Sequence, residues 1–123
     1  TVMATAIIGR IFTFQVLYVD QFNIPFAPDT PTITIFSHSM TDGAKTFHVN
    51  AEAITAIDPV ETGRYVYNFT LPATLEEGQT LYAEFRGTDP GAGDAPILVE
   101  QQVECHVQIA ATSTLRVQFV KGG

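Results

Sequence analysis

The sequence predicts an all-β fold, a single antiparallel β-sandwich of about seven to eight strands that spans residues 1–123. Apolar residues recur at every second position in most of the chain, which is the period of a half-buried strand. Gly, Pro, Asp and Asn separate these segments at regular intervals, as turns do in sandwiches. No amphipathic helical stripe of about 10 residues or more interrupts them, which argues against an α/β fold.

The first part of the chain contains strands on both sides of a proline-rich loop. Every second residue is apolar from Phe12 to Tyr18 in GRIFTFQVLYVD, which predicts a strand. Residues 20–29, DQFNIPFAPD, contain two prolines and are predicted to form a loop. The β-branched run PTITIFS favours a strand, and Asp42-Gly43 predicts a tight hairpin turn into the next one, AKTFHVN.

The middle of the chain holds its most aromatic segment, ETGRYVYNFTLP. Tyr65, Tyr67, Phe69 and Leu71 alternate there, and a proline, which has no N–H for a ladder, ends the run. We therefore expect an inner strand whose rings fill the space between two sheets. Residues 51–57, AEAITAI, suit a short helix or a strand, and the strand is favoured because its neighbours are strands.

Two long alternating segments and a loop follow. QTLYAEFRG predicts a strand, and residues 89–96, DPGAGDAP, are the clearest loop of the chain. A strand of unusual length is expected from Ile97 to Ile109, with a bulge or an edge position near Gln101, which interrupts the apolar series. TSTLRVQFV predicts the last strand.

The alternating positions predict the core of the sandwich. Its expected members are Phe12, Phe14, Val16, Tyr65, Tyr67, Phe69, Leu81, Phe85, Val99 and Val103. The single cysteine, Cys105, lies in the same kind of apolar series and is expected to be a small core residue rather than a nucleophile. One cysteine cannot form an intramolecular disulfide, so no disulfide framework supports this domain.

Charge and hydropathy exclude several partners. Thirteen acidic residues against six basic ones give a net charge of −7, so phosphate backbones are repelled and no nucleic-acid partner is expected. No apolar run approaches the roughly 18 residues that span a bilayer, so no membrane partner is expected. The start, TVMATAIIGR, lacks a basic leader before its apolar stretch, which favours synthesis in the cytoplasm.

The chain is predicted not to be an enzyme, with no catalytic, cofactor-binding or metal-binding residues and no cofactor. The spacing of His38, His48 and His106 does not suggest a metal site. Neighbouring strand residues point to opposite faces, so Cys105 and His106 make a poor dyad. The loop that begins at Asp89 has carboxylates and glycines but lacks the further acidic ligands that calcium needs.

With the strands placed, their order resembles a known group of modules. PTITIF, TGRYVYNFTLP and EGQTLYAEFRG follow one another as a proline-flanked strand and two strands that each combine a glycine with aromatic residues. This order is similar to that of the immunoglobulin-like modules of tailed-bacteriophage structural proteins, and the similarity covers roughly residues 9–108. The resemblance implies a virion protein, made in the host cytoplasm, that binds copies of itself as a homo-oligomer or other capsid decoration, neck or tail subunits.

The predicted contact surface consists of two loops and the two terminal segments. In the first loop three apolar residues, spaced two apart, are too hydrophobic to face only water, and the alternative is that they cap the open end of the sandwich. In the second loop the flanking carboxylates suit a basic partner surface. The candidate contact residues are Phe22, Ile24, Phe26, Asp89, Asp94, Leu115, Val117 and Phe119.

The apolar ends of the chain have two possible roles. Residues 1–8 and 111–123 either complete the sandwich or act as assembly arms that add to a neighbouring subunit's sheet edge. A different class of function is a carbohydrate-binding or surface-binding immunoglobulin-like module of a secreted bacterial protein. That class needs exposed aromatic residues grouped on one face or on a loop, and its candidates are Phe22, Phe26 and Tyr82.

Overall fold

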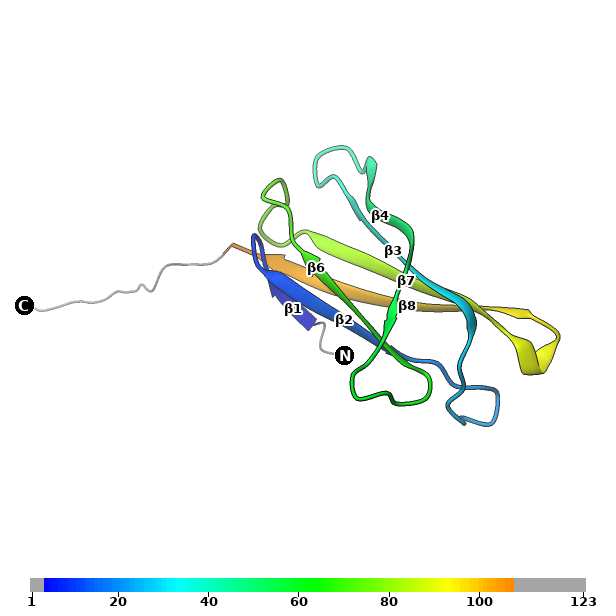
Figure 1. Ribbon diagram of the computed structural model, residues 1–123. Coiled ribbons are helices and arrows are strands. Elements are labelled where there is room, and N and C mark those ends of the chain that lie inside the picture. Colours follow the sequence, from blue (N-terminus) through cyan, green and yellow to red (C-terminus); the bar gives the residue numbers. More distant parts are fainter. Residues whose placement is uncertain (1–3, 108–123) are drawn as a thin grey trace, which may run out of the picture.

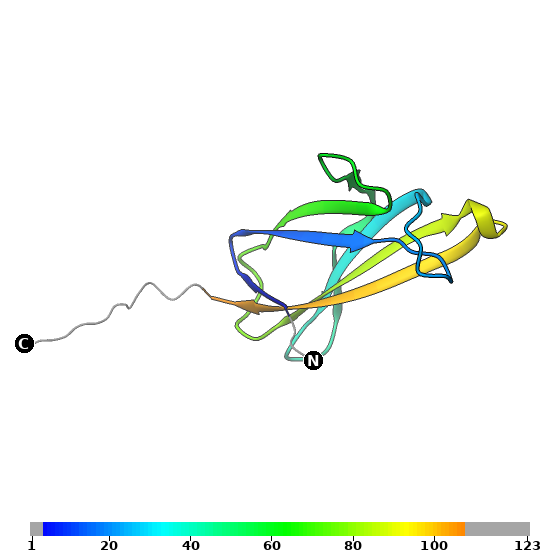
Figure 2. The ribbon, with the colours of Figure 1, turned by 90° about the horizontal axis from the view of Figure 1, so that it is seen from below.

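The computed structural model describes residues 4–107 and confirms the all-β sandwich. Figures 1 and 2 show two layers of strands packed face to face. Eight strands and one short 3₁₀ helix make up the fold. Their bounds are β1 Ala4–Ile7, β2 Ile11–Leu17, β3 Asp29–His38, β4 Lys45–Ala53, β5 Thr55–Ala56, β6 Arg64–Thr70, β7 Thr80–Asp89, η1 Pro90–Ala92 and β8 Ala95–His106.

The strand order is that of an immunoglobulin-type sandwich. One sheet has the order β1-β8-β7-β3-β4 and the other the order β2-β6-β5. All neighbours are antiparallel except β1 and β8, which run parallel from the pair Ala4–Val103 to the pair Ile7–His106. The predicted antiparallel sandwich is confirmed, and the parallel pairing of β1 with β8 is an addition to it that was not predicted. The segment beginning at Ala4 completes the sandwich of its own chain, which answers the question left open for that part of residues 1–8.

The core lies between the two sheets and only partly matches the prediction. Five of the ten predicted members are buried, namely Phe14, Val16, Leu81, Phe85 and Val103, and the other five pack against the core while remaining half-buried. Cys105 is buried as predicted. Tyr18, Ile33 and Ile35 are completely buried and were missing from the prediction, although their positions share the same alternation.

The three aromatic rings of β6 are half-buried because the smaller sheet is narrow on one side. β6 is the central strand of that sheet, as expected for an inner strand. Its neighbour β5 has only two residues, which pair with Val66 and Tyr65. No described strand pairs with the rest of β6 on the side of β5. The Tyr67 hydroxyl therefore reaches outward and donates a hydrogen bond to Glu52 at 3.0 Å.

Residues 51–57 form strand, as predicted, but in two pieces that belong to different sheets. β4 ends at Ala53 in the larger sheet and β5 begins at Thr55 in the smaller one. The buried Ile54 lies at the crossing, and its N–H donates to the carbonyl of Pro31. The single strand assumed from the sequence is thus a crossover between the layers.

The ladders correct two local predictions and decide between the two alternatives of a third. The connection at Asp42-Gly43 is not a two-residue turn, because β3 ends at His38 and β4 begins at Lys45. The second loop is shorter than residues 89–96, since Ala95 and Pro96 already pair with β7. No bulge occurs near Gln101, because the β7–β8 register is continuous. The alternative, an edge position, is correct there, since β1 pairs with β8 only from Val103 onward.

Several predictions fall outside the described residues. These are the last predicted strand, the end of the long strand at Ile109, the arm at residues 111–123 and the contact candidates Leu115, Val117 and Phe119. Within residues 4–107, no helix is long and apolar enough to cross a membrane.

Candidate functional site

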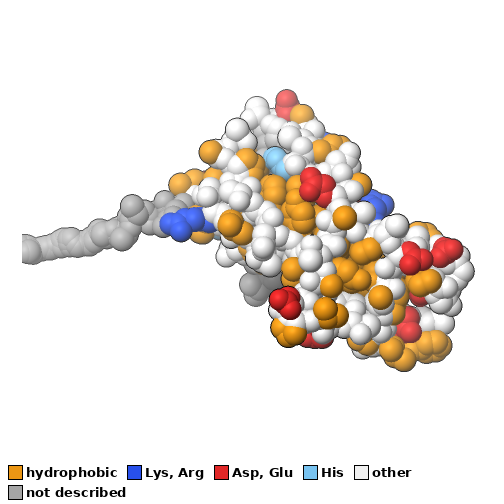
Figure 3. Space-filling model, viewed as in Figure 1, with side chains coloured by type: hydrophobic (Ala, Val, Ile, Leu, Met, Phe, Trp, Pro, Cys, Tyr) orange, Lys and Arg blue, Asp and Glu red, His pale blue; other side chains and the backbone are white. Residues whose placement is uncertain are grey.

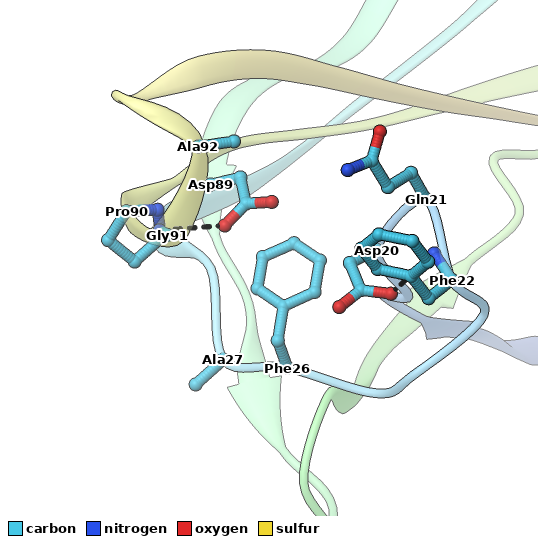
Figure 4. Close-up of a pocket in the computed structure, with 9 residues that line it drawn as sticks. All are labelled: Asp20, Gln21, Phe22, Phe26, Ala27, Asp89, Pro90, Gly91 and Ala92. Carbon is cyan, nitrogen blue, oxygen red and sulfur yellow. Dashed lines mark hydrogen bonds between the residues drawn. The ribbon is translucent and has the colours of Figure 1, made fainter.

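The two loops predicted as contact surface meet at one end of the sandwich and enclose a pocket (Figure 4). Its volume is about 370 Å³. One wall comes from the β2–β3 loop and the other from the turn that carries η1. The lining residues are Asp20, Gln21, Phe22, Phe26, Ala27, Asp89, Pro90, Gly91 and Ala92. In Figure 3, acidic and hydrophobic side chains lie beside one another over the end of the molecule that carries these loops.

Asp20 shapes the first wall. Its Oδ1 accepts hydrogen bonds from the backbone N–H groups of Phe22 at 2.8 Å and Ile24 at 3.0 Å. Its own N–H donates to the carbonyl of Ile24, and Asn23 takes the left-handed conformation at the tip. Asp and Asn are favoured in such turns because of these side-chain bonds and this backbone tolerance. The loop is therefore held in one conformation before any partner binds.

Asp89 shapes the second wall. It precedes η1, and its Oδ1 accepts a hydrogen bond from the N–H of Gly91 at 2.9 Å, as a helix cap does. Pro90 occupies the first helical position, where a missing N–H has no cost. Asp94, the other predicted carboxylate, does not line the pocket. It has a positive φ, and its N–H closes the turn onto the carbonyl of Asp89.

The three apolar residues of the first loop divide between the two predicted roles. Phe26 is half-buried and packs edge-on against the buried Tyr18, with ring centroids 6.5 Å apart. It therefore caps the open end of the sandwich. Phe22 and Ile24 remain 73% and 57% exposed, so capping does not account for them. These two are available to a partner.

The pocket combines negative charge with aromatic surface. Figure 4 shows the carboxylates of Asp20 and Asp89 on either side of the Phe26 ring, with Phe22 close to Asp20. One oxygen of each carboxylate holds a turn, and no Lys, Arg or His is among the lining residues. Carboxylates attract a cation directly, and aromatic rings attract it through their negative faces. The arrangement therefore suits an ammonium or guanidinium group.

Close backbone packing fixes the first loop to the sandwich. Tyr18 donates its N–H to Gly63 and accepts a hydrogen bond from Phe26 N–H at its carbonyl. Gly63 has a φ of +82°, and a Cβ there would lie 2.7 Å from the carbonyl oxygen of Tyr18, so only glycine fits. The Tyr18 hydroxyl crosses to the other sheet and donates to the carbonyl of Arg86 at 3.0 Å. Burial raises the pKa of Tyr18 to about 12, which keeps it a donor.

A Ser–His pair lies elsewhere in the sandwich and was not predicted. The hydroxyl of Ser37 and Nε2 of His48 are 2.8 Å apart. Residues 37 and 48 meet because β3 and β4 form a hairpin, and their sequence spacing carries no signal for this. Ser37 is only 2% exposed, and burial lowers the pKa of His48. The pair satisfies two polar groups at the margin of the core.

The remaining titratable cluster surrounds His106 at the end of β8. Its Nδ1 contacts Glu77 and its Nε2 lies 3.3 Å from Glu104. The hydrogen bond to Glu77 is the main cause of the raised pKa of His106. Burial raises the pKa of Cys105 to about 11, so its thiol is protonated at neutral pH. The described residues contain no group of three or more His, Cys, Asp or Glu side chains placed to hold a metal ion.

The three aromatic residues proposed for a carbohydrate site do not form one surface. Phe22 and Phe26 line the pocket at the loop end. Tyr82 instead stacks on Phe36 at 5.2 Å on the outer face of the larger sheet. It lies seven residues along β7 from Asp89, which corresponds to about 23 Å of strand. Phe22 and Phe26 therefore lie together at one loop, and Tyr82 lies apart from them.

Comparisons of the chain with protein-family models, with curated proteins and with solved structures found no match.

Proposed function

We propose that this domain acts by binding protein partners, without catalysis, as a structural subunit of a larger assembly. The observation that carries the proposal is the loop end, where two rigid turns present an exposed phenyl ring beside a pocket with two carboxylates. A loop that is already ordered loses little conformational entropy on binding, which favours affinity. Large aromatic side chains beside a pocket are the kind of residue that dominates binding energy at protein interfaces.

The partner group that the pocket fits best is a Lys or Arg side chain on another protein. Its charge would meet Asp20 and Asp89, and its aliphatic stem would lie along Phe26 and Phe22. The chain itself carries a net charge of −7, so a basic surface is attracted over a distance as well as at contact. This extends the expectation of a basic partner from the loop at Asp89 to both walls of the pocket.

The assembly that we propose is a tailed-bacteriophage virion, in which this chain would bind copies of itself or other decoration, neck or tail subunits. The support is the resemblance of the strand pattern to immunoglobulin-like virion modules, together with the immunoglobulin-type strand order of the two sheets. The loop end would supply contacts to other subunits.

Titration of the full chain with N-acetyl-lysine and N-acetyl-arginine amides tests the pocket. We expect backbone amide NMR signals of Phe22, Phe26 and Gly91 to shift at millimolar ligand. Asp20→Asn and Asp89→Asn keep an oxygen for each turn but remove the charge, and each should weaken the shifts about 10-fold or more. Glu52→Gln, an exposed acid outside the pocket, is the matched control. Equal binding by all four proteins, or shifts confined to another surface, would refute the assignment.

A further inference from the structure

β2 has one edge that no strand of the described chain covers. It is the first strand of the β2-β6-β5 sheet and pairs only with β6. Leu71 N–H donates to Arg10 and Tyr18 N–H donates to Gly63, so the even-numbered residues of β2 bond to the β6 side. The N–H and C=O groups of the odd-numbered residues therefore point away from the sheet.

The outward groups of β2 are almost all without a protein partner within residues 4–107. Gln15 is the exception, because its carbonyl accepts a hydrogen bond from the Gln101 side chain at 2.7 Å. The same bond shows independently that the backbone of Gln15 faces outward. Within residues 4–107, the outward N–H and C=O groups of Thr13 and Leu17 form no hydrogen bond to another residue. Such a row of groups is a template for another strand.

The other strand edges of the described chain carry the features that block pairing. β5 has two residues and β1 has four, which is too short for a stable ladder. β4 is irregular, with register shifts opposite β3, and contains Lys45 and Glu52. The uncovered part of β8 contains Pro96 and Glu100. Prolines, charges and bulges are common means of preventing edge-to-edge association.

β2 has none of these features. Its seven residues, IFTFQVL, include no charge, no proline and no glycine, and its register with β6 is continuous. Ile11 is 68% exposed at its start. An uncharged, regular edge of this length with free backbone groups is a pairing site.

We propose that β2 pairs antiparallel with β2 of a second copy of this chain, with Phe14 opposite Phe14 of the partner. This inference rests on the proposed function, since it names the self-association in that assembly. In this register Thr13 lies opposite Gln15 and Ile11 opposite Leu17, in both directions. The Thr13–Gln15 and Ile11–Leu17 pairs join residues with outward backbone groups, so hydrogen bonds form on both sides of the central Phe14 pair. The two small sheets become one six-stranded sheet.

The strand is complementary to itself in side chains and in charge. Residues whose side chains face the core lie opposite each other, because every pair joins two even-numbered or two odd-numbered residues. No charged residues oppose each other within the pair, although the chain as a whole has a net charge of −7. In this register Arg10 lies opposite Tyr18 of the other strand, two residues from its Asp20, so the nearest charges at each end of the pair are of opposite sign. The partner strand displaces Gln101 from Gln15.

Sedimentation equilibrium of the full chain and two double variants tests the pairing and its register. One strand pair is a small interface, so we expect a wild-type dimer with a Kd on the order of 10–100 µM. Thr13→Lys with Gln15→Lys places like charges opposite each other and should weaken the dimer about 10-fold or more. Thr13→Lys with Gln15→Glu places unlike charges opposite each other and should preserve it. The Lys/Lys variant carries a smaller net negative charge than the Lys/Glu variant. Repulsion between whole chains would therefore make the Lys/Lys dimer the tighter of the two, which is the opposite of what the pairing predicts.

Three outcomes overturn the pairing: a wild-type monomer at about 1 mM, a dimer that the Lys/Lys variant leaves intact, or loss of the dimer in the Lys/Glu variant. Hydrogen exchange of the wild type provides a test without substitution. The amides of Thr13, Gln15 and Leu17 should gain protection as concentration rises, and unchanged exchange contradicts the proposal. Phe22→Ser should leave the dimer intact, so loss of pocket binding and loss of the dimer are separate failures.

Discussion

β2 and the Ala95–Gln102 part of β8 lie at the same side of the sandwich but differ in how their edges are protected. Each has a strand on one side and none of the described chain on the other. The Gln101–Gln15 hydrogen bond links them. β8 carries a proline and a glutamate along its uncovered stretch, whereas β2 carries neither. Equal exposure of backbone groups therefore does not mean equal capacity to pair.

The side chains along an uncovered strand decide whether another strand can pair with it. Glu100 and Pro96 keep β8 solvated, and the same sheet position without them would invite another chain. β2 depends on a single side chain, Gln101, which caps one carbonyl.

The largest expected difference between an edge strand and a central strand comes from a proline at paired positions of β2 and β6. Gln15 and Val66 lie opposite each other, but the Gln15 N–H points outward while Val66 lies between two strands. Val66→Pro should cost about 1–3 kcal/mol of unfolding free energy, because it removes a ladder hydrogen bond and leaves its acceptor without a partner. Gln15→Pro should cost well under half of that. Urea unfolding measures both, and similar losses would show that β2 is not an edge.

A smaller effect is expected from the Gln101 side chain, which occupies one outward carbonyl of β2. Gln101→Ala removes the hydrogen bond to Gln15, and the net cost to the monomer should be about 1 kcal/mol or less. The same change frees the Gln15 carbonyl, so the dimer should become tighter rather than weaker. Gln102→Ala, the neighbouring position on β8, is the control. A weaker dimer in the Gln101 variant would mean that this side chain belongs to the interface.

The smallest effect concerns pH and compares two histidines. Burial lowers the pKa of His48 below its ordinary value, so this side chain binds a proton at a higher pH in the unfolded chain than in the folded one. As the pH falls below about 6.5, proton binding therefore favours the unfolded chain, and the stability contributed by neutral His48 is lost. The hydrogen bond to Glu77 raises the pKa of His106, so its contribution is complete below about pH 6.5 and is lost as pH rises through the raised pKa.

Replacing each histidine with glutamine separates the two contributions. When the pH is lowered from about 7.5 to about 5.5, a range around the ordinary histidine pKa, the His48→Gln variant should lose less unfolding free energy than the wild type loses. His106→Gln should lose more over the same interval. Parallel curves for all three proteins would show that neither histidine environment matters for stability. The experiment also establishes the range in which edge pairing can be compared without partial unfolding.

Strand pattern and core alternation were predictable because each depends on residues close in sequence. Phe14, Val16 and Leu81 follow the two-residue period and are buried. The half-burial of Tyr67 was not predictable, because it depends on the shortness of β5 in a different part of the chain. The parallel β1–β8 pair, the crossover at Ile54 and the Ser37–His48 contact likewise depend on tertiary register.

The candidate site shows the same division. Asp20 and Asp89 stand where turn chemistry favours Asp, so their loops were recognisable from sequence. Their meeting around Phe26 follows from the long β7–β8 hairpin, which carries η1 to the end of the molecule where the β2–β3 loop lies. The free edge of β2 was hidden as well, because an uncharged alternating strand has the same sequence signature in the centre of a sheet as at its edge.

The parallel pairing of β1 with β8 determines how the domain would carry a mechanical load. The chain enters β1 at Ala4, beside Val103, and leaves β8 at His106, beside Ile7. Tension between the two ends pulls these strands in opposite directions along their length. The hydrogen bonds of the pair are then loaded together in shear, instead of one after another as in peeling. A subunit strung between neighbours at its two ends would resist extension first at this short pair, while the β7–β8 ladder and the loop end stay unloaded.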